Sequence, residues 1–160
     1  MPGLQPPPLR FLIVRLAGRD FAIPAARLCG MMLLQTAGLI ETDRCGPLRF
    51  SLHLETRSLP VLIPHTLLGL QERRPSSRSC LLLVRDPARH AASAPSDAAF
   101  ALAVDSVSRL EEVPPSRYRA PGLIRLGETW REVLDPDQLY RAALASPASR
   151  TTKESATAAF

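Results

Sequence analysis

The chain has 160 residues, of which 46% are hydrophobic and 22% charged, with 20 basic against 15 acidic side chains and a formal net charge of +5. A chain of this size buries roughly two thirds of its unfolded surface, so the composition predicts one globular domain that needs neither metal nor disulfide bonds to hold its core. Apolar runs such as 11–14 and 80–84 fall far short of the ~20 residues of a membrane-spanning helix, which argues against a transmembrane segment.

The cysteines and the N-terminal residues bear on cellular location. Cys29, Cys45 and Cys80 are widely spaced and odd in number, a pattern typical of reduced thiols in a reducing compartment. Residues 1–8 are rich in proline and carry neither the basic start nor the apolar stretch of a secretory signal. We therefore expect a cytoplasmic protein whose cysteines are buried as small apolar residues.

The first half of the chain is predicted to form short strands after a disordered leader over residues 1–8. The expected strands are 9–16, 21–28, 48–54 and 58–63, with a short helical turn over 65–70. Gly18 sits in a turn between the first two runs, which indicates a hairpin. Residues 48–54 alternate apolar and polar side chains, as a half-buried strand does. Pro64 cannot donate to a sheet ladder, so the fourth strand should end there.

The second half repeats this pattern and closes on a helix. After a basic loop around 73–78, strands are expected over 79–85, 99–104, 107–113, 123–126 and 129–134. Asp135 can cap the free amides of a helix over 137–144, and Pro136 suits its first position. Residues 146–160 hold few apolar anchors and are predicted to be a disordered tail. The fold class expected is therefore all-β with short helices.

Four short motifs, taken in order, resemble landmarks of the CheW-like domain. Pro-Val-Leu at 60–62 and Leu-Gly-Leu at 68–70 are similar to its Pro-Val-Ile and Phe-Gly-Leu motifs. Val-Asp-Ser-Val at 104–107 is similar to its Val-Asp-x-Val turn, and 134–139 is similar to the Leu-Asp-x-x-x-Leu segment that opens its last helix. The resemblance covers roughly residues 9–145. Within it, residues 28–32 look like the strand that follows the family's short helical turn.

The resemblance implies an architecture and a role. It implies two packed five-stranded SH3-like β-barrels and a C-terminal helix, with one subdomain over about 9–70 plus a closing segment and a second over about 79–134. Members of the family are non-catalytic adaptors that bridge chemoreceptors to a histidine kinase. The expected partners are a methyl-accepting chemoreceptor and a CheA-type histidine kinase or another CheW-like protein.

The resemblance also implies a hydrophobic groove between the barrels, into which the helical hairpin tip of a receptor docks. Five apolar residues match groove positions of the family: Leu28, Cys80, Leu81, Val107 and Leu110. The alternative for each of them is an ordinary core position, because strand residues of this kind mostly pack internally.

Part of the first half departs from the family pattern. The changed positions are Phe50, His53, Glu55, Thr56 and Ile63, which stand where the family has glycine, asparagine, arginine, glycine and aspartate. Glu55 reverses a charge, so a partner carboxylate held by the arginine would now be repelled. Kinase coupling is therefore in doubt, unless Glu55 is only a solvent-facing strand residue. These departures raise the hypothesis of an accessory adaptor, such as the second CheW-like protein of a myxobacterial Frz-type system.

The residue pattern gives little support to catalysis. Asp105 has no second carboxylate at a defined spacing, and it is expected to accept hydrogen bonds from nearby amides in a turn. The histidines and cysteines lack the spacing of a metal site or of a catalytic dyad, and no glycine-rich phosphate loop occurs. We expect no enzyme, no cofactor, no metal site and no small-molecule substrate.

The alternative function is that of a small basic β-barrel that binds nucleic acid. Such barrels stack bases on exposed aromatic rings beside basic side chains. The chain has five phenylalanines, two tyrosines and one tryptophan, most of them at inward strand positions, and its arginines gather in loops. Nucleic acid is therefore the less favoured partner.

Overall fold

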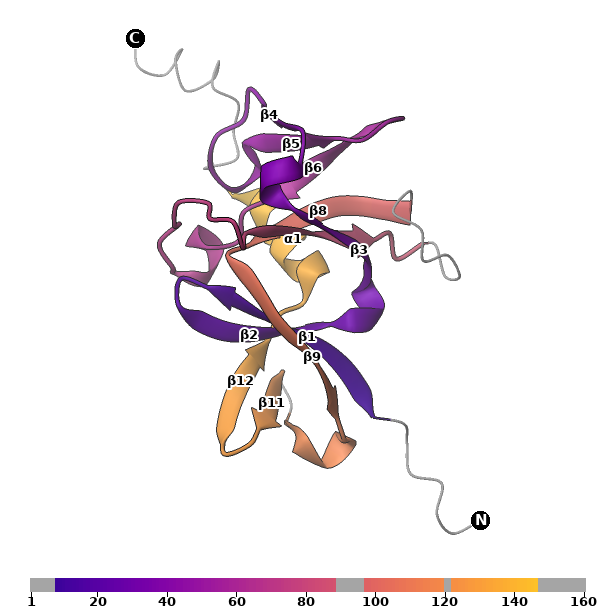
Figure 1. The fold of residues 1–160 in the computed structure, drawn as a ribbon, viewed down its shortest axis with the longest axis vertical. Helices are drawn as coiled ribbons and strands as arrows, with labels where there is room; N and C mark the ends of the chain where they lie inside the picture. Colours follow the sequence, from indigo (N-terminus) through magenta and orange to yellow (C-terminus); the bar gives the residue numbers. More distant parts are fainter. Residues whose placement is uncertain (1–7, 89–96, 120–121, 147–160) are drawn as a thin grey trace.

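The computed structural model describes residues 8–88, 97–119 and 122–146 and contains two antiparallel-rich sheets and one α-helix (Figure 1). The predicted disordered leader and tail lie outside the described residues, apart from Pro8 and Ser146. Among the described helices, none combines the length and the apolar character needed to cross a membrane.

Sheet A joins the beginning of the chain to its last third. In spatial order its strands are β10 (Tyr118–Arg119), β11 (Leu123–Leu126), β12 (Thr129–Val133), β2 (Arg19–Pro24), β1 (Leu9–Leu16) and β9 (Ser106–Val113). The hairpin β1–β2 forms where the sequence predicts it, because Ala17 and Gly18 take the positive φ values of 51° and 80° that a tight turn needs. The only parallel pair of this sheet in the described residues joins β12 to β2.

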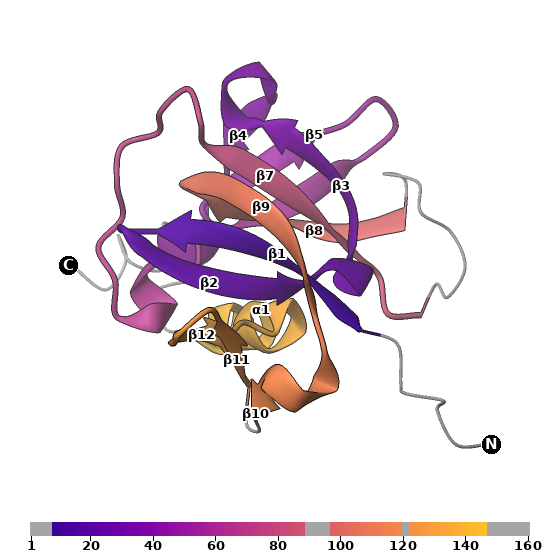
Figure 2. The same cartoon turned by 60° about the horizontal axis from the view of Figure 1, so that its bottom comes forward.

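Sheet B is built from the middle of the chain. In spatial order its strands are β3 (Leu28–Leu33), β7 (Cys80–Arg85), β8 (Ala98–Val104), β6 (Ser58–Leu62), β5 (Phe50–His53) and β4 (Leu39–Glu41). Short 3-10 turns connect the strands of both sheets: η1 (Ala25–Arg27), η2 (Leu34–Thr36), η3 (Gly46–Leu48), η4 (Thr66–Leu68) and η6 (Pro115–Arg117). Figure 2 shows β3, β4, β5 and β7 of sheet B above β1, β2 and β12 of sheet A in that view.

The strand order corrects two sequence-based expectations. The two sheets are not divided between residues 70 and 79, because β3 to β8 form one sheet and the strands on either side of them form the other. Residues 21–28 do not form one strand, since Pro24 ends β2 and a 3-10 turn leads the chain into sheet B. Each sheet has six strands among the described residues rather than five, because the short edge strands β4 and β10 were not foreseen.

The main core lies between the two sheets. It joins Val14 and Leu16 of β1 to apolar side chains of β7 and β8, among them Leu82 and Phe100, all of which are almost fully buried. Two further cores lie within the sheets, one inside sheet B and one inside sheet A. Because both faces of the central strands are covered, β7 reads as an unbroken apolar run rather than an alternating one.

Helix α1 (Pro136–Ala145) covers the main core, as the sequence predicts. The side chain of Asp135 accepts hydrogen bonds from the backbone N–H groups of Asp137 and Gln138, which fixes the start of the helix. On the inner face of the helix the ring of Tyr140 stacks on Phe100 of β8, with 4.4 Å between the ring centroids. The helix therefore holds to sheet B although it follows the last strand of sheet A.

Candidate partner-binding surface

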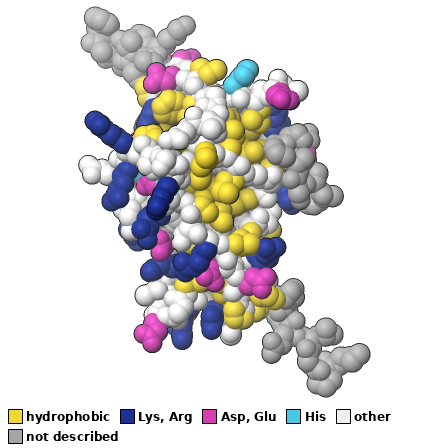
Figure 3. Space-filling view, viewed as in Figure 1, with side chains coloured by type: hydrophobic (Ala, Val, Ile, Leu, Met, Phe, Trp, Pro, Cys, Tyr) yellow, Lys and Arg dark blue, Asp and Glu magenta, His cyan; other side chains and the backbone are white. Residues whose placement is uncertain are grey.

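An exposed apolar patch lies at the junction of the two sheets. Met31 and Leu33 of β3 are 57% and 46% exposed, and Leu110 of β9 is 46% exposed. Leu12 of β1 and Val107 of β9 are half-buried and pack against the core between the sheets. Figure 3 shows apolar side chains gathered at the centre of this face, over the area that β3 and β9 occupy in Figure 1. We call these five residues the central apolar patch.

The sheet B side of the patch continues the buried face of that sheet. Across the β3–β7 pair, Met31 lies opposite Leu82 and Leu33 lies opposite Cys80. Directly opposed residues share a face of the sheet, and both β7 residues belong to the core between the sheets. Met31 and Leu33 are exposed because β3 is the edge strand of sheet B. Sheet B thus presents to solvent the same face with which it packs on sheet A.

The sheet A side of the patch depends on a β-bulge. Leu12 lies opposite Leu110 and Val14 lies opposite Val107, with a shift of register between the two pairs that leaves Ser108 unpaired on β9. Residues three apart on a regular strand point to opposite faces. The extra residue of the bulge brings Val107 and Leu110 onto the same face. The bulge therefore places both β9 residues of the central apolar patch on one face of sheet A.

The five residues expected to line a groove have different locations in the structure. Leu110 is exposed, while Leu28 and Val107 are half-buried against the core between the sheets. Cys80 is only 6% exposed and belongs to that core. Leu81 does not line a groove as expected. Its side chain points to the face of β7 opposite that of Cys80, is 0% exposed and belongs to the core inside sheet B. A period of two forces neighbours on a strand to opposite faces, so Cys80 and Leu81 could not both line one surface.

Met31, Leu33 and Leu12 were missed in the sequence. Their signal was weak, because Met31-Met32-Leu33-Leu34 reads as a uniform apolar run without alternation. Only the knowledge that β3 is an edge strand shows which of these side chains are uncovered. Methionine adapts its shape to different partners, and its exposure on a surface is typical of protein-binding sites.

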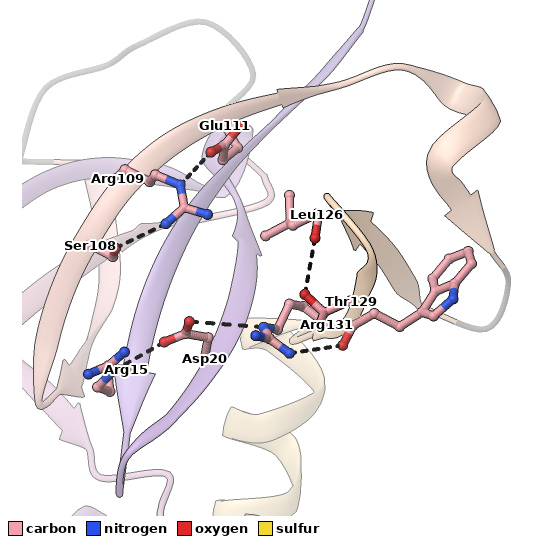
Figure 4. A network of polar contacts seen from close by, with 9 residues as sticks. Arg15, Asp20, Ser108, Arg109, Glu111, Leu126, Thr129 and Arg131 are labelled. Atoms are coloured by element: carbon pink, nitrogen blue, oxygen red, sulfur yellow. Dashed lines mark hydrogen bonds and ion pairs between the residues drawn. The ribbon is translucent and has the colours of Figure 1, made fainter.

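Two groups of charged side chains on sheet A form ion pairs among themselves (Figure 4). Arg109 and Glu111, the sequence neighbours of Leu110, form an ion pair with each other. Asp20 lies between Arg15, at 3.2 Å, and Arg131, at 3.9 Å. Exposed pairs of this kind add little stability. On β9, the exposed Leu110 is thus an apolar side chain between two charged residues that pair with each other.

The five residues that depart from the family pattern separate into two groups. His53, Glu55 and Thr56 are exposed at the connection between β5 and β6, where the Leu54 N–H donates to the Arg57 carbonyl. The other two changed residues, Phe50 and Ile63, are half-buried and line a cavity at one end of sheet B. The two groups therefore lie in different surroundings, one exposed in the connection and the other at the wall of the cavity. Glu55 is exposed, but it lies in the bend between the two strands and not in a strand.

Asp105 links the two sheets at the point where the chain passes from β8 to β9. Its Oδ2 accepts a hydrogen bond of 2.7 Å from the Ala17 N–H in the β1–β2 turn, and its Oδ1 lies 3.0 Å from Nε2 of His65. An ionised carboxylate only accepts hydrogen bonds, so Nε2 carries the proton. His65 is 3% exposed, and its Nδ1 has no partner among the described residues. Asp105 does accept a hydrogen bond from a backbone amide, as expected, but the amide belongs to a residue distant in sequence and not to a nearby one.

Two buried cysteines, Cys29 and Cys80, are the next candidates for reactive side chains. Burial raises the pKa of the Cys29 and Cys80 thiols above the ordinary 9.0, so both are poor nucleophiles at neutral pH. Within the described part of the chain no three histidine, cysteine or acidic side chains are grouped closely enough to hold a metal ion.

Comparison with known proteins agrees with this geometry. The family model of the CheW-like domain matches residues 10–141. The chain belongs to the CheW-like family. Among solved structures, the CheW-like chain is similar to the crystal structure of the scaffolding protein TtCheW from Thermoanaerobacter tengcongensis. The TM-score is 0.69 at 12% sequence identity, over 83% of this chain and 92% of that one. Comparison with curated proteins by sequence gives no match. The predicted fold class is confirmed, and at this identity the structural likeness concerns the fold alone.

Proposed function

We propose that this CheW-like protein is a non-enzymatic adaptor of a bacterial chemotaxis-like system and that it binds the helical hairpin tip of a methyl-accepting chemoreceptor. The observation that carries the proposal is the central apolar patch, an uncovered continuation of the core between the sheets. A helix laid against such a face gains most of its affinity from buried aliphatic groups. This role requires a cytoplasmic location, which the sequence also predicts.

Receptor binding is tested with single aspartate substitutions on the patch. Met31→Asp and Leu110→Asp change one exposed side chain on each sheet, so neither variant should disturb the fold. Ile40→Asp is the matched control, because Ile40 is 54% exposed on β4, at the opposite edge of sheet B from β3. An unpaired charge in an apolar interface should weaken binding to a receptor-tip hairpin at least about tenfold.

The outcome is measured by co-sedimentation with receptor-tip hairpins displayed on vesicles, and circular dichroism confirms that each variant is folded. Equal affinities of the Met31, Leu110 and Ile40 variants would refute the assignment of the patch.

The second part of the proposal concerns Glu55 and binding to the histidine kinase. We infer that coupling to a CheA-type histidine kinase, or to another CheW-like protein, is weakened at the β5–β6 connection, where the exposed Glu55 stands in place of the family's arginine. The role of accessory adaptor rests on this charge reversal. Glu55→Arg should then strengthen binding to a kinase regulatory domain, while Glu55→Gln gives an intermediate affinity. Kinase binding by the unaltered protein that matches a complete homologue would contradict the inference.

Nucleic-acid binding remains a second candidate because of one specific observation. Trp130, the single tryptophan of the chain, is 40% exposed, and the guanidinium carbon of Arg119 lies 5.2 Å from its ring centroid. Tyr118, next to Arg119 on β10, is 42% exposed. Arginines therefore do lie beside rings, contrary to the sequence-based expectation that they gather only in loops. A mobility shift of single-stranded DNA that weakens steeply with salt, and that Trp130→Ala abolishes, would support this function.

A further inference from the structure

A cavity of ≈ 200 Å³ opens at the end of sheet B, apart from the central apolar patch. Apolar side chains form its walls, among them Phe50, Val61 and Ala103 of the strands and Ile63 directly after β6. The loop after η4 forms its rim with Glu72 and Arg73. Mouths of small barrels are common ligand sites, and an apolar wall with a few polar groups is their usual lining.

Two of the wall residues depart from the family pattern that the sequence resembles. Phe50 and Ile63 stand at positions where the family pattern has glycine and aspartate, so both changes add apolar surface to the cavity. Both side chains are half-buried, whereas Leu52 of the same sheet is fully buried. Apolar side chains left half-buried around a hollow indicate a surface that another apolar group can cover.

The inner end of the cavity is polar. His65 lines it, and this ring is 3% exposed with an Nδ1 atom that lacks a partner among the described residues. Asp105 also lines it, but both of its oxygens already accept hydrogen bonds, from Ala17 and from the His65 ring. Buried polar atoms are nearly always paired in native proteins. Because Nε2 carries the proton, Nδ1 can only accept a hydrogen bond, so this end does not suit a carboxylate and the rim is the place for one.

The charged side chains at the rim of the cavity are Arg49, Glu72 and Arg73. Arg49 and Glu72 neutralise each other through two hydrogen bonds between the guanidinium and the carboxylate. Within the described residues no acidic partner is recorded for Arg73, whose guanidinium lies against Gly18 of the β1–β2 turn. An uncommitted guanidinium presents a planar fork that fits a carboxylate.

We propose that this cavity binds a small carboxylate with one ring or a short aliphatic chain, with its apolar body against Phe50 and Ile63 and its carboxylate at Arg73. The site is separate from the partner surfaces described above, so it stands or falls independently of the adaptor role. It implies that the protein senses or stores a metabolite-sized organic acid in addition to binding proteins.

The test uses the full chain and four probes, namely hexanoate, benzoate, hexan-1-ol and benzyl alcohol, with saturation-transfer NMR and isothermal titration. The carboxylates should bind saturably, and the neutral alcohols at least about tenfold more weakly, because they lose the charge-assisted hydrogen bonds. Arg73→Glu should weaken carboxylate binding at least about tenfold. Arg74→Glu is the matched control, since Arg74 is exposed on the same loop and does not line the cavity.

A second variant tests the walls rather than the charge. Ala103→Leu places three more carbons in the cavity and should abolish binding of both carboxylates, while a urea titration shows whether the variant is folded. If Ala103→Leu proves unfolded, the pair Arg73→Glu and Arg74→Glu still decides the matter. Absence of saturable binding of either acid at tens of millimolar overturns the proposal. Equal binding of alcohols and acids, or equal loss in the two arginine variants, also overturns it.

Discussion

Replacing Asp105 with alanine should destabilise the protein by about 2–5 kcal/mol, although Asp105 is not a catalytic residue. The substitution removes two hydrogen bonds at the crossing between the sheets, one from Ala17 and one from His65. A hydrogen bond to a charged group contributes about 1.5–3 kcal/mol, and more of this is lost when the remaining partner stays buried. His65 stays buried at 3% exposure, whereas water can reach the half-buried Ala17, which sets the lower limit of the range.

The assay is equilibrium urea unfolding followed by circular dichroism. At the usual dependence of about 1–3 kcal/mol per molar urea, a loss near 3 kcal/mol lowers the midpoint by roughly 1–3 M. Asp105→Asn is the matched control, because the amide oxygen still accepts one hydrogen bond and the shape is kept, so it should cost about half as much or less. An unfolding free energy of Asp105→Ala within about 0.5 kcal/mol of the unaltered protein would refute the idea that this carboxylate ties the sheets together.

The burial pattern gives three further predictions. Leu81→Ala should lower the free energy of unfolding by about 2–5 kcal/mol in the same urea assay, and Leu110→Ala by less than about 0.5 kcal/mol, because only the first leaves a cavity in the core. Comparable losses in the two variants would contradict the assignment of Leu81 to the core and Leu110 to the surface. Asp135→Ala should cost about 1 kcal/mol through loss of the helix cap, whereas Asp135→Ser should restore most of it, as thermal unfolding can show. The buried thiols Cys29 and Cys80 should react with a disulfide reagent only as fast as the protein unfolds, since burial raises the pKa of both. Above pH 9 the unfolded chain releases these protons while the folded one retains them, so stability should fall as the pH rises, and a flat profile from pH 8 to 10 would speak against it.

The sequence predicted local structure better than the grouping of strands. Strands such as 9–16 and 123–126 and the cap at Asp135 follow from alternation, turn residues and helix-start chemistry, which are all local. The assignment of strands to sheets failed because the β1–β9 pairing is a long-range choice that no local pattern encodes. The family resemblance gave the fold class, but counting along the chain could not give its division into sheets.

The candidate site was predicted only in part for a related reason. Leu110 and Val107 were found, but their shared face depends on the unpaired Ser108, and a bulge has no clear signal in the sequence. Leu81 was misassigned because an all-apolar strand gives no hint of which side faces solvent. Met31 was missed because its exposure follows from the edge position of β3 and not from its neighbours in the chain.

In the sequence, the strands of sheet B lie between the two groups of strands that form sheet A. This order has a consequence for synthesis on the ribosome. Strands β3 to β8 are consecutive, so sheet B can assemble as soon as β8 has emerged. The hairpin β1–β2 is made first but must wait for β9, which begins roughly 90 residues after β1 ends, or about 5–20 s at ordinary elongation rates. Sheet B is complete only when β8 ends at Val104, so its apolar face has only a partial cover while the roughly 40 residues up to the end of α1 are made, which takes about 2–8 s. In that time the nascent chain is open to capture by chaperones or by another copy of itself.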